Sequence, residues 1–240
     1  MRLHRNLVYT TIDSLNFIFN EGEYADKIVA KALKKDLRWG AKDRKFVAET
    51  IYEIVRWKRL YAEIAEVKEP YNREDLWRMF AVWAVLRGYP IPDWTQLEGT
   101  PNRRIKGRFE ELSKIRKYRE SIPDWMDELG VKELGEALWT KEISAQNEQA
   151  KVILRVNTLK TTKEKLRAIL MDLDIDTEIV KEYPQALVLK ERANVFMTDA
   201  FKEGLFEVQD ASSQLVADML DVEPGMRVID TCAGAGGKTL

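Results

Sequence analysis

The chain has 240 residues, of which 45% are apolar and one is cysteine, and its net charge is −1. This composition supports packed cores and excludes a disordered tail or a globally basic nucleic-acid-binding protein, while a lone cysteine excludes an internal disulfide framework. No apolar run approaches the ~20 residues that span a bilayer and no signal peptide is evident, so a cytoplasmic protein is expected.

The first part of the sequence has a helical pattern. Apolar residues recur at spacings of three and four, as in Val8, Ile12 and Leu15, and this spacing predicts amphipathic helices. The expected helices cover residues 8–19, 28–33, 46–55, 76–86, 109–118, a segment starting at Asp124, and 134–149. We assign residues 1–145 to an all-α domain.

The pattern changes to alternation after residue 150. Leu154 and Val156 are separated by Arg155, which predicts a strand with at least one apolar face. The elements expected next are a helix capped by Thr161 or Thr162 and strands at 177–181 and 186–190. This β-α-β-β order predicts a small α+β domain of ferredoxin-like type over residues 146–203.

The last part, residues 204–240, has the pattern of the first βα unit of a Rossmann-like α/β domain. Its expected elements are a strand at 205–208, a helix capped by Asp210 or Ser212, and a strand at 227–230. The last strand enters the glycine-rich turn Asp230-Thr-Cys-Ala-Gly-Ala-Gly-Gly-Lys-Thr239. The predicted fold class is therefore multidomain: an all-α domain, a ferredoxin-like domain and the start of a Rossmann-like domain.

The glycine-rich turn can be compared with three cofactor patterns. A phosphate-binding P-loop would place its first glycine at Cys232, and a dinucleotide-binding turn would place its third glycine at Thr239. The S-adenosylmethionine pattern, an acidic residue followed four residues later by G-x-G, matches Asp230, Gly234 and Gly236. An ordinary strand–turn–helix corner is the remaining alternative. The expected S-adenosylmethionine-binding residues are Cys232, Ala233, Gly234, Ala235, Gly236, Gly237 and Lys238.

The turn also carries a family resemblance. Asp230–Thr239 resembles the first motif of the RNA cytosine-5 methyltransferases of the RsmB (Sun/Fmu) type. Three further segments resemble the same family: Gly204-Leu-Phe-Glu-Val-Gln-Asp-Ala-Ser-Ser-Gln214, Leu154-Arg-Val-Asn-Thr-Leu159 and Ser121-Ile-Pro-Asp-Trp125. The helical N-terminus is similar to the NusB-like RNA-binding domain of some members, notably from Asp43-Arg-Lys-Phe-Val to Tyr52-Glu-Ile-Val-Arg56.

The resemblance implies transfer of a methyl group from S-adenosylmethionine to C5 of a cytosine in RNA, with ribosomal RNA as the expected substrate. In such proteins a cysteine thiolate adds to C6 of the cytosine, and a second cysteine helps to release the product. Both cysteines belong to motifs expected beyond residue 240, and Cys232 matches neither. We therefore assign no catalytic residue and expect this polypeptide to lack methyltransferase activity and to bind the cofactor weakly or not at all.

Two local stretches are strongly basic although the whole chain is not. Residues 31–45 and 101–120 each have a net charge of +5, so each could bind RNA phosphates or could simply be a solvated helix face. Arg155 and Asn157 either position RNA or are exposed residues on an edge strand. Gln209 and Asp210 lie next to the expected cofactor domain, and Asp210 could be only a helix cap.

Two classes of function fit these patterns. The first is the RNA-binding portion of an RNA methyltransferase, and the alternative is a stand-alone RNA- or protein-binding module with a vestigial cofactor loop. The reading frame beyond residue 240 would separate them. No metal site is expected, because the sole histidine, His4, has no cysteine partners. The oligomeric state is left open.

Overall fold

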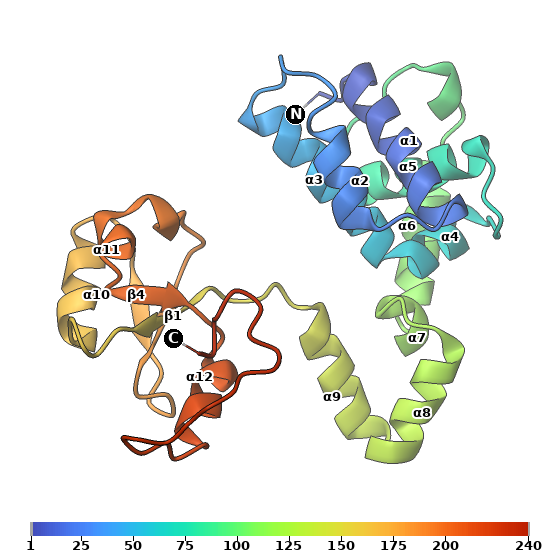
Figure 1. The fold of residues 1–240 in the computed structure, drawn as a ribbon. Coiled ribbons are helices and arrows are strands. Elements are labelled where there is room, and N and C mark those ends of the chain that lie inside the picture. The colour runs from blue at the N-terminus through green and yellow to red at the C-terminus, as the bar shows by residue number, and fades with distance from the viewer. Residues whose placement is uncertain (1, 240) are drawn as a thin grey trace. The chain divides into compact units, whose positions relative to one another are not determined.

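The computed structural model describes residues 2–239 and divides the chain into two compact units, residues 1–148 and 149–240. Figure 1 shows an all-helical first unit and a second unit built on a small sheet. The helices of the first unit are α1 (Arg5–Asn20), α2 (Ala25–Ala32), α3 (Ala41–Arg56), α4 (Lys58–Ala65), α5 (Arg73–Leu86), η1 (Thr95–Leu97), α6 (Asn102–Leu112), α7 (Arg116–Arg119), α8 (Asp124–Leu134) and α9 (Glu136–Asn147). We call this part the helical unit, and the helical N-terminal region predicted from sequence is confirmed.

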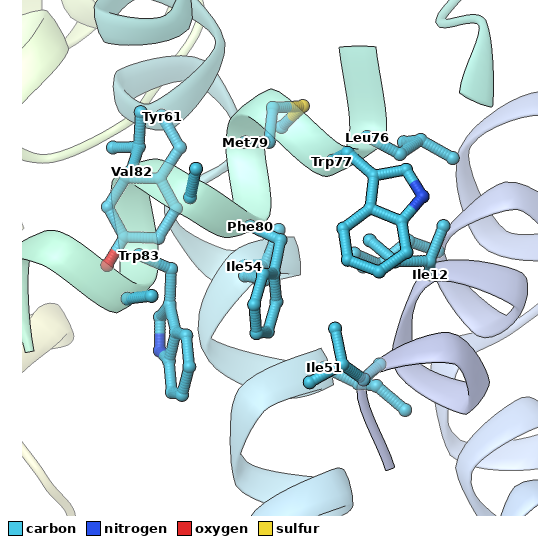
Figure 2. Packing of buried hydrophobic residues seen from close by; sticks show 14 of the residues in the cluster. Ile12, Ile51, Ile54, Tyr61, Leu76, Trp77, Met79, Phe80, Val82 and Trp83 are labelled. Carbon is cyan, nitrogen blue, oxygen red and sulfur yellow. The ribbon is translucent and has the colours of Figure 1, made fainter. Parts of the chain in front are cut away.

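Helix α5 is the centre of the helical unit. Asn72 caps it: the Asn72 side chain accepts a hydrogen bond from the Asp75 N–H (2.9 Å) and the Asp75 carboxylate accepts one from the Asn72 N–H (3.0 Å). Nine of the 14 residues of α5 are buried, as expected for a helix with neighbours on most sides. Figure 2 shows Phe80 between Trp77 and Trp83, with ring centroids 6.2 and 5.3 Å apart.

The α8–α9 hairpin has its own small apolar cluster, in which Ile122, Trp139 and Ile143 are buried. Gly130 lies directly against the Trp139 ring, because a Cβ at residue 130 would come within 2.2 Å of the indole. The Trp139 Nε1–H donates to the Asp127 carboxylate at 2.9 Å, and Arg116 donates to the same carboxylate at 2.6 and 3.1 Å. Polar contacts therefore join this hairpin to the segment before it.

Two details of the helical unit differ from the sequence predictions. The helix expected at 109–118 is broken between α6 and α7, where residues 113–115 form a turn. Helix α4 was not predicted, because a single residue separates it from α3 and its apolar residues continue the α3 pattern. The start of α8 at Asp124, directly after Pro123, is as predicted.

The second unit contains a four-stranded antiparallel sheet in the order β2-β3-β1-β4. Its elements are β1 (Ile153–Val156), α10 (Lys163–Met171), β2 (Thr177–Ile179), β3 (Ala186–Leu189), η2 (Val195–Met197), α11 (Asp199–Lys202), β4 (Phe206–Val208) and α12 (Ala211–Asp218). The β-α-β-β-α-β order confirms the ferredoxin-like prediction, and Thr162 is the N-cap of α10. The strand expected at 205–208 also forms, and it pairs with β1 in this sheet (Figure 1).

The core of the second unit lies between the sheet and α10. Leu154 and Val156 of β1 are buried, together with Leu166 and Leu170 of α10 and Phe206 of β4. Buried and partly buried residues therefore alternate along β1 as the sequence predicts, and one face of the strand is turned toward the core.

The predicted start of a Rossmann-like domain is wrong for the residues that the structure describes. Residues 227–230 are not a strand, and no segment within residues 2–239 pairs with them. A strand needs at least one neighbouring strand to pair its backbone N–H and C=O groups, and residues 2–239 supply none for this segment. Val228 and Ile229 are accordingly 56% and 85% exposed.

Candidate nucleic-acid interface and cofactor loop

The glycine-rich loop is held in shape by Asp230. Its carboxylate accepts hydrogen bonds from the Cys232 N–H at 3.0 Å and from the Thr239 hydroxyl at 2.7 Å. The Thr239 hydroxyl, together with the Cys232 N–H, holds the pKa of Asp230 below its ordinary value. Gly234 and Gly236 have φ values of 55° and 81°, a region that favours residues without a Cβ. The tight turn inferred from the sequence is thus present.

The loop residues fit part of what a cofactor site requires. A Cβ at Gly237 would meet nothing within 4 Å, so the backbone there is open to close approach. Cys232 is exposed, and its Sγ lies 3.9 Å from the Thr231 hydroxyl.

Two buried glutamines support the loop, and only one of them was singled out from the sequence. The Gln209 side-chain amide donates to the Gly237 carbonyl, and the Gln214 amide donates to the Gln209 carbonyl at 3.0 Å. Both side chains are buried, and neither Oε1 has a partner within the described chain. The five-residue spacing of these glutamines around a helix start was the available signal for Gln214.

Asp210 is a helix cap, one of the two roles considered for it. Its carboxylate accepts a hydrogen bond from the Ser212 N–H at 3.1 Å at the start of α12. The Ser212 hydroxyl also donates to it at 2.5 Å, and these bonds lower the pKa of Asp210. The carboxylate is thus engaged at its own helix rather than in the glycine loop.

Arg155 is not on an edge strand, because β1 lies between β3 and β4, and Asn157 follows the last residue of β1. Arg155 is opposite Ala186 on one side and Glu207 on the other. The Asn157 amide donates to the Gly204 carbonyl at 2.9 Å, and Lys160 donates to the Glu203 carbonyl at 2.7 Å. Asn157 therefore fixes the chain that leads into β4.

Most of the basic residues in the 101–120 stretch are already paired. Arg116 and Arg104 contact carboxylates at 2.5–2.6 Å. The other paired cations in this stretch are Arg108, Lys117 and Arg119. The cations without a carboxylate partner among residues 2–239 are Arg103, Lys106 and Lys114, which we call the 103–114 cations. Five of the eight basic residues thus stabilise the helical unit itself.

The 31–45 stretch is divided in a similar way. Lys35, Arg38 and Lys45 form ion pairs, and Arg44 donates to the carbonyls of Leu33 and Trp39. Lys31, Lys34 and Lys42 have neither an ion pair nor a side-chain hydrogen bond to a carbonyl within the described residues, and we call them the 31–42 cations. All of them lie on α2, on the α2–α3 turn or in the first turn of α3.

The described residues contain no cluster of histidine, cysteine, aspartate and glutamate that could hold a metal ion. His4 is exposed and precedes α1. None of the helices described in residues 2–239 combines the length and apolar character needed to cross a membrane.

Comparison with known proteins finds a matching family model and several similar proteins. Residues 122–196 match the family described as "Methyltr_RsmF/B-like, ferredoxin-like domain". The "Probable ribosomal RNA small subunit methyltransferase B" of Synechocystis sp. is 28% identical over 268 residues, covering 98% of this chain and 59% of the relative. The "Ribosomal RNA small subunit methyltransferase B" of Pasteurella multocida is 34% identical over 146 residues, covering 60% of this chain and 32% of the relative. The chain therefore spans less than two thirds of the length of these relatives.

A solved structure shares the fold. The crystal structure of PH0851 superposes with a TM-score of 0.64 at 21% sequence identity, covering all of this chain and 60% of PH0851. At this identity the likeness concerns the fold alone.

Proposed function

We propose that this chain is the RNA-binding portion of an S-adenosylmethionine-dependent ribosomal RNA cytosine-C5 methyltransferase. The chain is a homologue of the RsmB-like small-subunit ribosomal RNA methyltransferases, and it covers an N-terminal portion of them with the ferredoxin-like domain. The observation that carries the proposal is the alignment with the Synechocystis relative, which extends over 98% of this chain and so includes both units.

In this proposal the helical unit is a NusB-like domain that binds RNA. Its support is the presence of the 31–42 and 103–114 cations, which have no carboxylate partner within residues 2–239. Cations of this kind bind phosphates by releasing condensed counterions, and the affinity they provide falls as salt rises. They position RNA without reading its sequence.

The glycine loop would contribute to the cofactor site. Residues Cys232 to Lys238 would hold S-adenosylmethionine, with the positive φ of Gly234 and Gly236 allowing the backbone to approach the ligand. Gln209 would keep the loop in place through the Gly237 carbonyl. S-adenosylmethionine, when bound, supplies an electrophilic methyl group. The exposed loop and the unpaired segment 227–230 support weak cofactor binding, and no methyl transfer, by the 240-residue chain alone.

The absence of a strand at residues 227–230 also favours a second candidate, a stand-alone binding module whose loop is vestigial. Equilibrium dialysis of the full chain against tritiated S-adenosylmethionine separates the two. Measurable binding that is lost in Gly236→Val supports a cofactor loop, because a β-branched residue is strained at positive φ. Measurable binding that is unchanged in this variant favours the module.

The RNA-binding part is tested by the salt dependence of affinity. Small-subunit ribosomal RNA is titrated with the full chain and with the triple variant R103Q/K106Q/K114Q. We expect the triple variant to bind more weakly and to have a salt slope smaller by about one for each phosphate that is no longer neutralised. The matched control is K151Q/K165Q/K181Q, which removes three exposed lysines of the second unit that have no ion pair. Equal weakening in the two triple variants would contradict RNA binding by the helical unit.

A further inference from the structure

The helical unit contains a cavity of about 360 Å³ at the place where several helices end. This volume lies within the ~300–1,000 Å³ that small-ligand pockets occupy. The wall is formed by residues from the end of α3, from α4, from the end of α5, and from α6 and α7. Every element of this wall belongs to the helical unit.

Aromatic rings form part of the wall. Trp57 and Phe109 both line the cavity, and the Phe109 side chain is 38% exposed. An exposed aromatic ring in a concave site offers a flat surface on which a nucleobase can stack, whatever its identity.

Two arginines also line the cavity, and each is held through its Nε atom; Arg119 also donates through Nη1 to the Ser113 carbonyl at 3.4 Å. Arg87 donates through Nε to Glu53 at 2.7 Å, and Arg119 donates through Nε to Glu120 at 2.9 Å. No partner within residues 2–239 uses the terminal Nη groups of Arg87. An arginine oriented through Nε in this way can present its remaining donors to an anion with little further loss of freedom.

Glu53 is oriented by two donors at the same oxygen. Arg87 and the Tyr61 hydroxyl, at 3.1 Å, both donate to Oε1, and no hydrogen bond within the described residues uses Oε2. Burial, together with the charge of Glu53, raises the pKa of Tyr61, so its hydroxyl stays protonated and keeps donating. The free Oε2 is an acceptor suited to an N–H group of a ligand.

We propose that this cavity binds one unpaired nucleotide of single-stranded RNA, with the base against Phe109 and Trp57 and a phosphate at Arg87. This inference rests on the proposed function and adds to it the class of RNA recognised. An apolar side chain from a protein partner fits the cavity less well, because it would cover the free Nη groups of Arg87 and Oε2 of Glu53 without satisfying them. A nucleotide satisfies the aromatic wall and the polar groups together.

The surface next to the cavity extends the same chemistry. Lys106 lies one helical turn before Phe109 on α6, and Arg103 lies one turn before Lys106, so the three share a helix face. Neither cation has a carboxylate partner within residues 2–239. Lys106 and Arg103 can therefore bind the RNA phosphates next to the nucleotide in the cavity, along α6.

The first test measures stacking. A fluorescein-labelled ten-nucleotide RNA is titrated with the full chain, once as a single strand and once as a duplex. Phe109→Ala and Phe109→Leu should each weaken single-strand binding by about tenfold and leave duplex binding unchanged, because duplex bases are not free to enter. Phe109→Tyr should keep the wild-type affinity, since it keeps the aromatic face. The control Phe17→Ala removes a ring on α1 that is also 38% exposed and does not line the cavity.

The second test measures phosphate binding at Arg87. Arg87→Gln should weaken single-strand binding about threefold to tenfold and reduce the salt slope by about one. Arg78→Gln is the matched control: the Arg78 side chain is 55% exposed and paired with Glu74, as Arg87 is 57% exposed and paired with Glu53, but it does not line the cavity. This control should leave the affinity unchanged.

The outcomes separate this inference from the proposed function. If the wild-type chain binds single-stranded RNA and all three Phe109 variants bind it equally well, the inference is overturned while the proposed function stands. The remaining candidate ligand of the cavity is then a side chain of a protein partner. If Phe109→Leu keeps the affinity and Phe109→Ala loses it, apolar packing replaces stacking and the inference is again overturned. If the wild-type chain binds neither form of RNA, both are overturned.

Discussion

The helical unit and the last 21 described residues, 219–239, use apolar side chains in opposite ways. In the helical unit Ile12, Ile51 and Phe80 are fully buried. In residues 219–239 the apolar side chains remain exposed, with Met219 at 83% and Ile229 at 85%. In this second region Val228 and Ile229 are β-branched, as strand residues often are, but residues 2–239 supply no neighbouring element that would bury them.

This contrast teaches that apolar pattern alone does not produce structure. Burial supplies the free energy that offsets the loss of chain entropy on folding, and burial requires a second surface. In the helical unit α5 meets such surfaces on most of its sides. Within residues 2–239 no second surface covers Val228 and Ile229. The glycine loop that follows them is positioned instead by hydrogen bonds that the Asp230 carboxylate accepts and by one that the Gln209 amide donates.

The largest expected effect comes from the centre of the helical unit. Phe80→Ala removes a ring that is fully buried between Trp77 and Trp83, and we expect it to lower the free energy of unfolding by about 3–5 kcal/mol. All seven tryptophans lie within residues 39–139, so tryptophan fluorescence during urea unfolding reports this unit alone. A decrease in the free energy of unfolding of less than about 1 kcal/mol would contradict the contrast between a tightly packed helical unit and exposed apolar residues at 219–239.

A pair of glycines sharpens the comparison within the helical unit. Gly130→Ala should lower the free energy of unfolding by about 1–3 kcal/mol, because its Cβ would lie 2.2 Å from the Trp139 ring. Gly107→Ala, also inside a helix but with nothing within 4 Å of its Cβ, should raise stability by about 0.5–1 kcal/mol. The same fluorescence measurement checks both variants, and equal effects of either sign would contradict the packing described here.

Glu120 should make the stability of the helical unit depend on pH. Burial by itself raises the pKa of Glu120, but hydrogen bonds from Ser144, Asn147 and Arg119 outweigh it and hold the pKa below its ordinary value. A carboxyl with a lowered pKa stabilises the fold fully above its unfolded pKa of about 4.3 and loses this contribution as pH falls through its folded pKa.

Glu120→Gln should therefore lower the free energy of unfolding by about 1–2 kcal/mol at pH 7. The difference from wild type should shrink as the pH is lowered below about 4. Urea unfolding at a series of pH values measures this, and a difference independent of pH would show that the carboxylate charge contributes nothing.

The smallest effect is expected in residues 219–239. Ile229→Ala should change stability by less than about 0.5 kcal/mol, because the side chain is 85% exposed. Leu166→Ala, in the same unit but fully buried, should cost about 2–5 kcal/mol. Thermal unfolding followed by far-ultraviolet circular dichroism compares the two. A large destabilisation in Ile229→Ala would mean that this segment is packed.

The sequence predicts those parts of the fold that local pattern determines. The capped start of α10 at Thr162, the alternation along β1 and the tight turn at Gly234 and Gly236 all follow from neighbouring residues. Helix α4 was missed because a single residue, Trp57, separates it from α3. The strand at 227–230 was predicted wrongly because strand formation depends on partners that local pattern does not reveal.

The candidate sites depend on interactions between distant residues, which explains why less of them could be predicted. Gln209 reaches Gly237, 28 residues later, and the cavity collects side chains from Glu53 to Arg119. Net charge identified both basic stretches, but it could not show that Arg116 and Lys117 are engaged by carboxylates. Only the folded arrangement distinguishes cations that are paired with carboxylates from cations that have no carboxylate partner within residues 2–239.

The most direct test of RNA binding by the helical unit is hydrogen exchange of the full chain, followed by mass spectrometry with and without small-subunit ribosomal RNA. We predict added protection at residues 102–119, which include α6 and α7, and no change at residues 219–239. Protection confined to residues 149–239, or no protection anywhere in the helical unit under conditions where RNA is bound, would contradict RNA binding by this unit.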